Sequence, residues 1–279
     1  MKLQFTKMHG CGNDYIYFNC MDKELDNPGQ LSIKLSDRHF SVGGDGIIMI
    51  CSSDKADARM RMFNADGSEG KMCGNATRCI GKYLYDNGIV KKDKISLETL
   101  SGIKYLDLTV ENGKVKLVSV DMGKAILTPS EIPVNLPGDV AVNVPHSVGG
   151  KDYNITCISM GNPHCVVFGG DPDEIELEKV GPMFENDKIF PERVNTEFAQ
   201  IIDESTIKMR VWERGSGETL ACGTGACATA VAAVLCGYCK KGEDITLKLR
   251  GGELIINYTD ERVLMTGPAA VSFTGEVEI

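Results

Sequence analysis

Two cysteines carry the clearest chemical signal in this sequence of 279 residues. Cys73 and Cys222 each occupy a Cys-Gly-small-small turn that opens a helical run. A thiol at the first turn of a helix lies near unpaired backbone N–H groups and the positive end of the helix dipole, which stabilise a thiolate. We therefore expect a lowered pKa at each cysteine, and their equivalent settings indicate paired chemistry.

The residues after the two cysteines predict a binding site for a carboxylate. Gly74, Asn75, Gly223 and Thr224 are small and leave the backbone N–H groups of the helix starts accessible to an anion. Two such sites facing one another would hold one amino-acid carboxylate from both sides. A thiolate could then remove the α proton while a thiol returns one to the opposite face, as in a two-base racemase or epimerase. Donors fixed in a water-excluded site would stabilise the developing charge without a cofactor.

The two cysteines belong to an internal repeat. The offset between them, 149 positions, also carries Asn13 onto Asn162 and Glu69 onto Glu218. A repeat this long that occurs twice indicates duplicated domains, because solenoid units are shorter and more numerous. We predict a first domain of residues 1–122 with 270–279 and a second domain of residues 123–269.

Periodicity predicts a mixed α+β fold. Asn112-Gly113 separates two alternating runs and predicts a tight hairpin, whereas residues 75–85 and 224–238 read as helices that end at Gly88 and Gly242. The second helix is apolar on every face, which is typical of a buried helix. Residues 128–145 contain four prolines and predict an irregular loop. We expect each domain to be a curved, mainly antiparallel sheet wrapped around a central helix.

Composition narrows the class of protein and its partners. A net charge of -9 without a basic run argues against a nucleic-acid or acidic-membrane partner, and favours a small-molecule substrate. The amino terminus lacks the apolar core of a signal peptide, and no apolar run reaches the length of a membrane span. We therefore expect a cytoplasmic protein, in which the eleven cysteines are thiols and not a disulfide framework.

Two other classes of protein compete with a two-base isomerase. A metal or redox protein would need paired Cys-x-x-Cys knuckles, whereas Cys236 and Cys239 form one such pair, at a helix end, where we interpret it as structural. A thiol hydrolase could pair His164 with one cysteine, but it leaves the second cysteine turn unexplained. We therefore expect no metal and no cofactor.

Five motifs together resemble the diaminopimelate epimerase family over nearly the whole chain: GNDY at Gly12, FNADGSEGKMCGNATRC from Phe63, GNPH at Gly161, VNTEF at Val194 and WERGSGETLACGTGA from Trp212. The resemblance implies interconversion of LL- and meso-2,6-diaminoheptanedioate, an isomerase reaction of lysine and peptidoglycan precursor biosynthesis. It also implies two similar domains, no pyridoxal phosphate and a homodimer. Proline racemases and phenazine-biosynthesis isomerases carry similar turns and remain alternatives.

The resemblance also implies roles for individual residues. Cys73 and Cys222 become the two acid/base residues, and His164 and Glu213 the residues that tune their proton affinity. The positions that would contact substrate are Asn13, Asn64, Gly74, Asn75, Asn162, Asn195, Glu213, Arg214, Gly223 and Thr224. Arg214 offers planar bidentate recognition of a carboxylate. Gly46 departs from the family, since some members place a substrate-contacting glutamine there.

Overall fold

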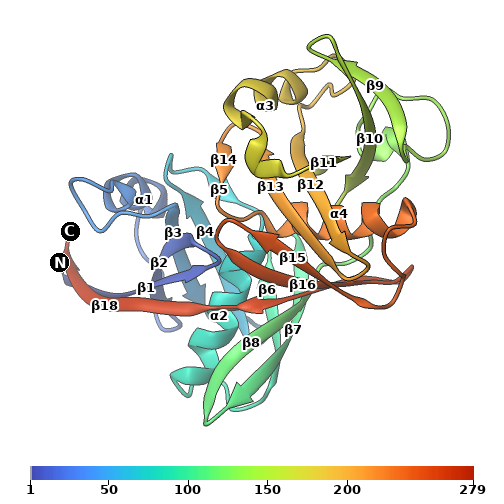
Figure 1. Cartoon of the computed structure of the whole chain (residues 1–279). Helices are drawn as coiled ribbons and strands as arrows, with labels where there is room; N and C mark the ends of the chain where they lie inside the picture. The colour runs from blue at the N-terminus through green and yellow to red at the C-terminus, as the bar shows by residue number, and fades with distance from the viewer. Residues whose placement is uncertain (1) are drawn as a thin grey trace. The chain divides into compact units, whose positions relative to one another are not determined.

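The computed structural model describes residues 2–279, which divide into two compact units. The first unit extends to Asp121 and includes Thr266–Ile279, and the second is Met122–Met265 (Figure 1). The boundaries of the homologous domains inferred from the repeat stay a prediction. Among residues 2–279, no helix has both the length and the apolarity that a membrane span requires.

The first unit is built on a mainly antiparallel sheet. Antiparallel pairs join β18 to β1, β1 to β2, β3 to β4, β4 to β5, β6 to β7 and β7 to β8, whereas β2–β3 and β4–β6 are parallel. The strands are β1 (Lys2–Gly10), β2 (Asn13–Cys20), β3 (Gly46–Cys51), β4 (Ala58–Asn64), β5 (Glu69–Gly70), β6 (Lys94–Thr99), β7 (Gly102–Glu111), β8 (Lys114–Asp121) and β18 (Ala270–Glu278).

The second unit repeats the same order of pairings. Antiparallel pairs join β9 to β10, β10 to β11, β12 to β13, β13 to β14 and β15 to β16. Parallel pairs join β11 to β12 and β13 to β15. The strands are β9 (Val144–Val148), β10 (Lys151–Ser159), β11 (Pro163–Phe168), β12 (Asn195–Asp203), β13 (Thr206–Glu213), β14 (Gly217–Thr219), β15 (Asp244–Leu249), β16 (Gly252–Tyr258) and β17 (Val263–Pro268), which contains the unit boundary.

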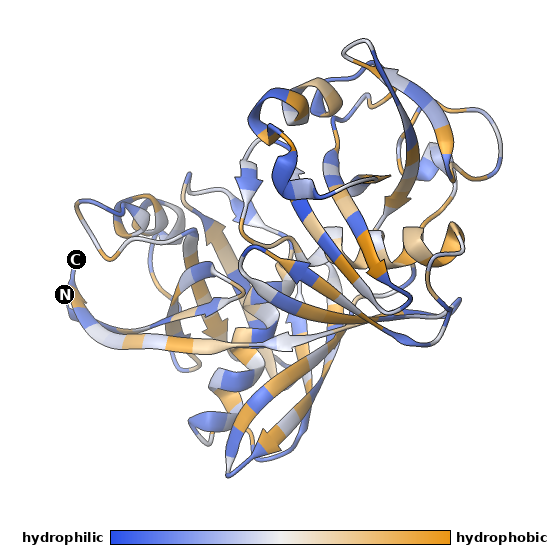
Figure 2. Cartoon of the chain, in the orientation of Figure 1, coloured by the Kyte–Doolittle hydropathy of each residue, from blue (hydrophilic) through white to orange (hydrophobic). Residues whose placement is uncertain are grey.

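Each unit contains one helix of 13 residues that begins directly after a cysteine. These helices are α2 (Gly74–Asp86), which packs on β1, β2, β7 and β8, and α4 (Gly223–Leu235), which packs on β10, β11, β12, β15 and β16 (Figure 1). Figure 2 shows α4 largely in the hydrophobic colours, and ten of its residues are buried. The duplicated α+β fold, with a central helix in each copy, is therefore confirmed.

The predicted end of the second helix is wrong. α4 stops at Leu235 and not at Tyr238, because Gly237 adopts a left-handed φ of 80° and the Tyr238 N–H bonds back to the Ala233 carbonyl. Gly242 is also left-handed, but it belongs to the next turn. The end of α2 is as predicted, with Gly88 at φ 70°.

The hairpin and the irregular loop also match their predictions. Asn112 and Gly113 both have positive φ, 51° and 74°, as a primed turn requires, and they join β7 to β8. Residues 128–145 contain the short 3-10 turn η1 (Pro129–Glu131) and no strand before Val144. The remaining helical segments are α1 (Pro28–Ser36), α3 (Leu177–Glu185) and η2 (Pro172–Glu174).

The duplication extends to matched ion pairs behind the cysteine turns. Arg61 Nε lies 2.8 Å from Glu69 Oε1 in the first unit, and Arg210 Nε lies 2.7 Å from Glu218 Oε1 in the second. In each case the arginine is on a central strand and the glutamate on the short strand that leads into the cysteine turn. The ion pairs hold equivalent turns in equivalent places.

Candidate active site

Cys222 is a buried thiol at the N-terminus of α4. Its Sγ accepts a hydrogen bond from the Gly225 N–H at 3.4 Å and lies 3.4 Å from Thr224 Oγ1. Burial, followed by the negative charges of Glu213 and Glu197, raises its pKa well above the ordinary value, although the bonds from Thr224 and Gly225 act in the opposite direction. The expectation of a lowered pKa is therefore wrong for Cys222, because desolvation outweighs the helix terminus.

A continuous set of hydrogen bonds connects Cys222 to a buried carboxylate. Thr224 Oγ1 accepts from Asn162 Nδ2 at 3.3 Å, and Asn162 Oδ1 lies 3.1 Å from His164 Nε2. His164 Nδ1 lies 2.6 Å from Glu197 Oε1, and neither side chain is exposed to solvent. The structure thus brings together three of the predicted residues around Cys222 and adds Glu197.

Glu213 lies beside the same thiol. Its pKa is raised by burial, while hydrogen bonds from Thr219 and Cys222 and the His164 charge act in the opposite direction. The Thr219 hydroxyl bonds to Glu213 Oε1. A partly buried carboxylate that accepts from the Cys222 thiol is in place to receive or return its proton.

Asn195 and Arg214 meet at the adjoining loop of the second unit. Asn195 is buried opposite His164 in the β11–β12 pairing, and its Oδ1 accepts from the Arg214 backbone N–H at 2.9 Å. The Arg214 guanidinium donates to the Glu192 carbonyl at 2.8 Å through Nη1. It is partly exposed, so its other donors can reach a ligand.

Cys73 has a different setting at the N-terminus of α2. It is partly exposed, and its thiol donates to Asn13 Oδ1 at 3.4 Å. Asn75 Nδ2 donates to the same oxygen at 3.4 Å, and Asn13 Nδ2 donates to Asp45 Oδ2 at 2.7 Å. Asn13, Cys73 and Asn75 are therefore grouped as predicted, and Asp45 is an addition.

Asn64 and Gly46 occupy paired positions of β4 and β3. Asn64 Nδ2 donates to Ser68 Oγ at 3.0 Å, within the turn that follows β4. Gly46 has a φ of 155°, and a Cβ there would lie 2.1 Å from the Phe63 carbonyl oxygen. A side chain at Gly46 would force the Phe63 carbonyl to shift, so the substrate contact expected of a glutamine at this position is lost or replaced here.

Sequence reasoning missed Glu197 and Asp45. Glu197 lies two residues after Asn195 on a strand, and side chains at i and i+2 share a face. That spacing could have placed the carboxylate beside the predicted site, within the motif VNTEF itself. The sequence around Asp45, GGDG, gives no comparable sign.

His164, Glu197 and Cys222 also form a group of potential metal ligands, with one atom from each lying within 4.8 Å of the others. The His164–Glu197 distance of 2.6 Å is that of a hydrogen bond. Two ligands of a tetrahedral zinc, at bond lengths of about 2.0–2.1 Å, would be more than about 3 Å apart. We therefore interpret the group as hydrogen-bonded.

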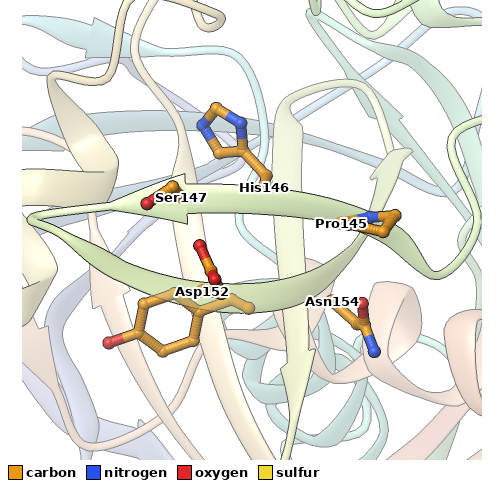
Figure 3. A pocket seen from close by; sticks show the side chains of 6 residues that line it. Pro145, His146, Ser147, Asp152 and Asn154 are labelled. Carbon is orange, nitrogen blue, oxygen red and sulfur yellow. The ribbon is translucent and has the colours of Figure 1, made fainter.

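A cavity of about 400 Å³ lies at the β9–β10 hairpin (Figure 3). It is lined by Pro145, His146, Ser147, Asp152, Tyr153 and Asn154. None of the predicted site residues lines it. It offers no cysteine and no helix terminus, so we do not assign the chemistry to it.

Solved structures with the same fold are isomerases and their relatives. A phenazine biosynthesis protein of the PhzF family from Bacillus anthracis matches with a TM-score of 0.75 and 16% identity, covering 100% of both chains. A hydroxyproline epimerase from Agrobacterium vitis, with bound trans-4-OH-L-proline, matches with a TM-score of 0.73 and 12% identity, covering 99% of this chain and 92% of its own. The fold is thus that of this group of racemases and isomerases.

Sequence comparison defines the family. A family model described as diaminopimelate epimerase matches residues 5–128 and 156–272. A diaminopimelate epimerase from Acetivibrio thermocellus is 54% identical over 279 residues, covering 99% of each chain, and one from Methanococcus maripaludis strain C5 is 53% identical over 281 residues, covering 99% of this chain and 100% of its own. The chain belongs to the diaminopimelate epimerase family and is an isomerase.

Proposed function

We propose that this isomerase interconverts LL- and meso-2,6-diaminoheptanedioate with Cys73 and Cys222 as its two acid/base residues. The observation that carries the proposal is the duplicated setting of the two thiols. Each lies at the N-terminus of a 13-residue helix and is connected by hydrogen bonds to an asparagine at the beginning of a strand. Asn13 is the first residue of β2, and Asn162 immediately precedes β11. The high identity to relatives named diaminopimelate epimerase supports the substrate.

The proposed reaction needs no cofactor. One cysteine, as a thiolate, removes the α proton and becomes a thiol, while the other thiol donates its proton to the opposite face of the same carbon. The backbone N–H groups of Gly74, Asn75, Gly223 and Thr224 would bind the adjacent carboxylate and stabilise the charge that develops on it. Loss of the proton from one sulfur is balanced by its gain at the other, so each turnover leaves the two thiols with exchanged roles.

The remaining residues would read the rest of the substrate. The partly exposed Arg214 guanidinium would bind the second carboxylate, and the amides of Asn64 and Asn195 would bind polar groups at the far end of the substrate. Glu213 would accept from a substrate ammonium and, with His164, tune Cys222. A substrate with an amino and a carboxyl group at each end can bind all of these polar side chains, whereas proline is too small to do so.

The cellular setting follows from the substrate. We propose that the enzyme acts in lysine and peptidoglycan precursor biosynthesis, in the cytoplasm and as a homodimer, with diaminoheptanedioate as its small-molecule partner. The net charge of -9 supports a role without nucleic acid or an acidic membrane surface. Sedimentation velocity of the purified protein measures the oligomeric state directly.

The deciding experiment is incubation of the reduced protein with LL-diaminopimelate in deuterated water, with L-proline as a parallel substrate. We expect meso product that carries deuterium at the inverted carbon, and no deuterium in proline. Turnover of proline alone would assign the chain to a proline racemase-like activity instead, and turnover of neither would refute the proposal.

A further inference from the structure

The hydrogen bonds around His164 can be assigned a donor and an acceptor at each step between that residue and the Cys222 sulfur. Glu197 is a carboxylate acceptor, so His164 Nδ1 donates to it at 2.6 Å. Asn162 Nδ2 donates to Thr224 Oγ1, which leaves Asn162 Oδ1 to accept from His164 Nε2 at 3.1 Å. With the amide and the carboxylate placed in this way, both imidazole nitrogens face acceptors, which is the arrangement that suits a charged imidazolium.

This arrangement leaves the hydroxyl hydrogen of Thr224 available for the Cys222 sulfur. Because Thr224 Oγ1 already accepts from Asn162, its own hydrogen is available for the Cys222 sulfur, 3.4 Å away. If His164 lost its Nε2 proton, the Asn162 amide would turn so that its NH₂ faced the imidazole. Its oxygen would then accept from Thr224, and Cys222 would lose that donor.

The fold leaves room for the Glu197 carboxylate at the start of α4. It is fully buried, and a Cβ at position 225 would lie 2.5 Å from its Oε1, so glycine there admits the carboxylate to the helix start. A carboxylate excluded from solvent is stable in its charged form when it is paired with a cation. His164, on the neighbouring parallel strand, is the group in place to be that cation.

The first unit retains the asparagine and the cysteine but not this pair. The offset of 149 positions that relates the halves places Tyr15 at the position of His164 and Ile48 at that of Glu197. Cys73 instead donates to Asn13 Oδ1, which favours the thiol. Cys73 thus has an amide oxygen beside it, where Cys222 has the Thr224 hydroxyl.

We propose that Glu197 is a positioning residue for Cys222, which holds His164 as an imidazolium so that Asn162 and Thr224 direct one hydrogen bond to the Cys222 sulfur and favour its thiolate. The inference deepens the proposed function and rests on it for its role in catalysis. The groups that face His164 are Glu197 on β12, Glu213 on β13 and Cys222 on α4. We call the path from Glu197 to Cys222 the Glu197 relay.

The direction in which Glu197→Gln shifts the Cys222 titration distinguishes the relay from a direct charge effect of Glu197 on the thiol. The negative charge of Glu197, acting through space, raises the pKa of Cys222. Neutralising it by Glu197→Gln without a relay would therefore make the Cys222 thiolate form at lower pH. The relay predicts the opposite result, since a neutral partner no longer holds His164 charged and Cys222 loses its donor.

The experiment measures iodoacetamide alkylation of each cysteine against pH, located by peptide mass spectrometry, on the full chain without substrate. In Glu197→Gln we expect the Cys222 midpoint to rise by about one pH unit, which is about tenfold slower alkylation at a fixed pH below it. The Cys73 midpoint in the same sample is the internal control and should not move. A fall of the Cys222 midpoint, or no change, would refute the relay.

Further variants test each connection in the relay. Thr224→Val should raise the Cys222 midpoint, and Thr224→Ser, which keeps the hydroxyl, should not. Combining Thr224→Val with Glu197→Gln should add little to either variant alone, because both remove the same donor. Additive shifts would contradict a common path. Glu185→Gln, which neutralises a buried carboxylate bonded to Trp212 and Gly215, is the matched control and should leave the Cys222 midpoint unchanged.

A substitution can change the alkylation rate of Cys222 for reasons unrelated to the relay. The protonation state of His164 is therefore measured directly by NMR spectroscopy. In ¹⁵N–¹H spectra of the wild-type histidines, both His164 nitrogens should carry protons, and in Glu197→Gln one should lose its proton at neutral pH. A neutral His164 in the wild type would overturn the inference. The alkylation and NMR measurements do not require turnover. An inactive wild type in the deuterium experiment would therefore refute the proposed function, whereas the relay would still be accepted or refuted by these two measurements.

Discussion

Asp45 determines which end of the Asn13 amide faces Cys73. Asp45 Oδ2 accepts from Asn13 Nδ2 at 2.7 Å and from the Asp14 backbone N–H at 3.0 Å, while its other oxygen lies 2.9 Å from Arg38 Nη2. The amide oxygen of Asn13 is therefore presented to the Cys73 thiol. A carboxylate outside the predicted site orients a residue within it.

Asp45→Asn should lower kcat by roughly tenfold with a smaller effect on KM, because the amide of Asn13 could then turn and present its NH₂ to Cys73. The same variant should lower the pH midpoint of Cys73 alkylation, since a donor favours the thiolate. Steady-state kinetics and alkylation check both effects. Asp107→Asn, which neutralises an exposed carboxylate paired with Lys94, is the matched control. An unchanged Cys73 midpoint would show that Asp45 has only a structural role.

Cys73→Ala and Cys222→Ala should each abolish epimerisation while the chain still folds. A positioned acid or base contributes about 10²–10⁴-fold, so each variant should lose at least about 100-fold in kcat. Circular dichroism and thermal melting check the fold, and chiral analysis of the product checks the activity. Cys236→Ala is the control. Near wild-type turnover by either single variant would mean that one base suffices.

Oxidation should join Cys73 to Cys222 and stop turnover reversibly. The proposed mechanism requires both sulfurs to reach one carbon, and two sulfurs that do so should also be able to reach one another and form a disulfide. Peptide mapping after mild oxidation identifies the bond, and dithiothreitol should restore activity. Turnover that persists with this disulfide formed would contradict the requirement.

Alkaline pH should destabilise the fold. Burial raises the pKa of Cys79 to about 12 and raises those of Tyr17 and Cys222. The unfolded chain releases these protons at lower pH than the folded chain, so stability is complete below the unfolded values and falls as pH rises through the folded ones. Melting temperatures should drop steadily from about pH 8.5 upward.

Cys79→Ala tests the source of this alkaline loss. The variant should be less stable at neutral pH, because a cavity remains, yet its melting temperature should fall less steeply with pH than that of the wild type. Equal slopes would mean that Cys79 makes no contribution to the pH dependence.

Gly46→Gln should destabilise the first unit instead of restoring a substrate contact. Its φ of 155° and a Cβ 2.1 Å from the Phe63 oxygen force a shift of the β3–β4 backbone, which should cost at least about 3 kcal/mol in the free energy of unfolding. Urea unfolding measures the loss. Gly169→Gln, where no atom lies within 4 Å of the added Cβ, should cost little. Wild-type stability in Gly46→Gln would contradict the steric argument.

The sequence predicted the duplicated fold and the starts of both central helices, because those features depend on local residues and on the repeat. It did not predict where α4 ends, since Gly237 and Gly242 both adopt left-handed conformations and either could close a helix. The packing of the following turn decides between them.

The direction predicted for the Cys222 pKa is wrong for a similar reason. The helix terminus that lowers a thiol pKa is a local feature, whereas burial and the charges of Glu197 and Glu213 come from strands that are distant in the sequence. Glu197 itself was missed because no residue near it in the sequence is a visible partner for its carboxylate. Its partner, His164, is 33 residues away.

The matched ion pairs of Arg61 with Glu69 and Arg210 with Glu218 show that the supports of the two cysteine turns are alike. The hydrogen-bonding partners of the sulfurs are not alike, since the Asn13 amide accepts from Cys73 whereas the Thr224 hydroxyl and the Gly225 N–H lie against Cys222. Two identical copies would hold two equivalent thiols, with no reason for the proton to prefer either. Because both copies belong to one chain, a substitution can change the surroundings of one thiol and leave those of the other unchanged.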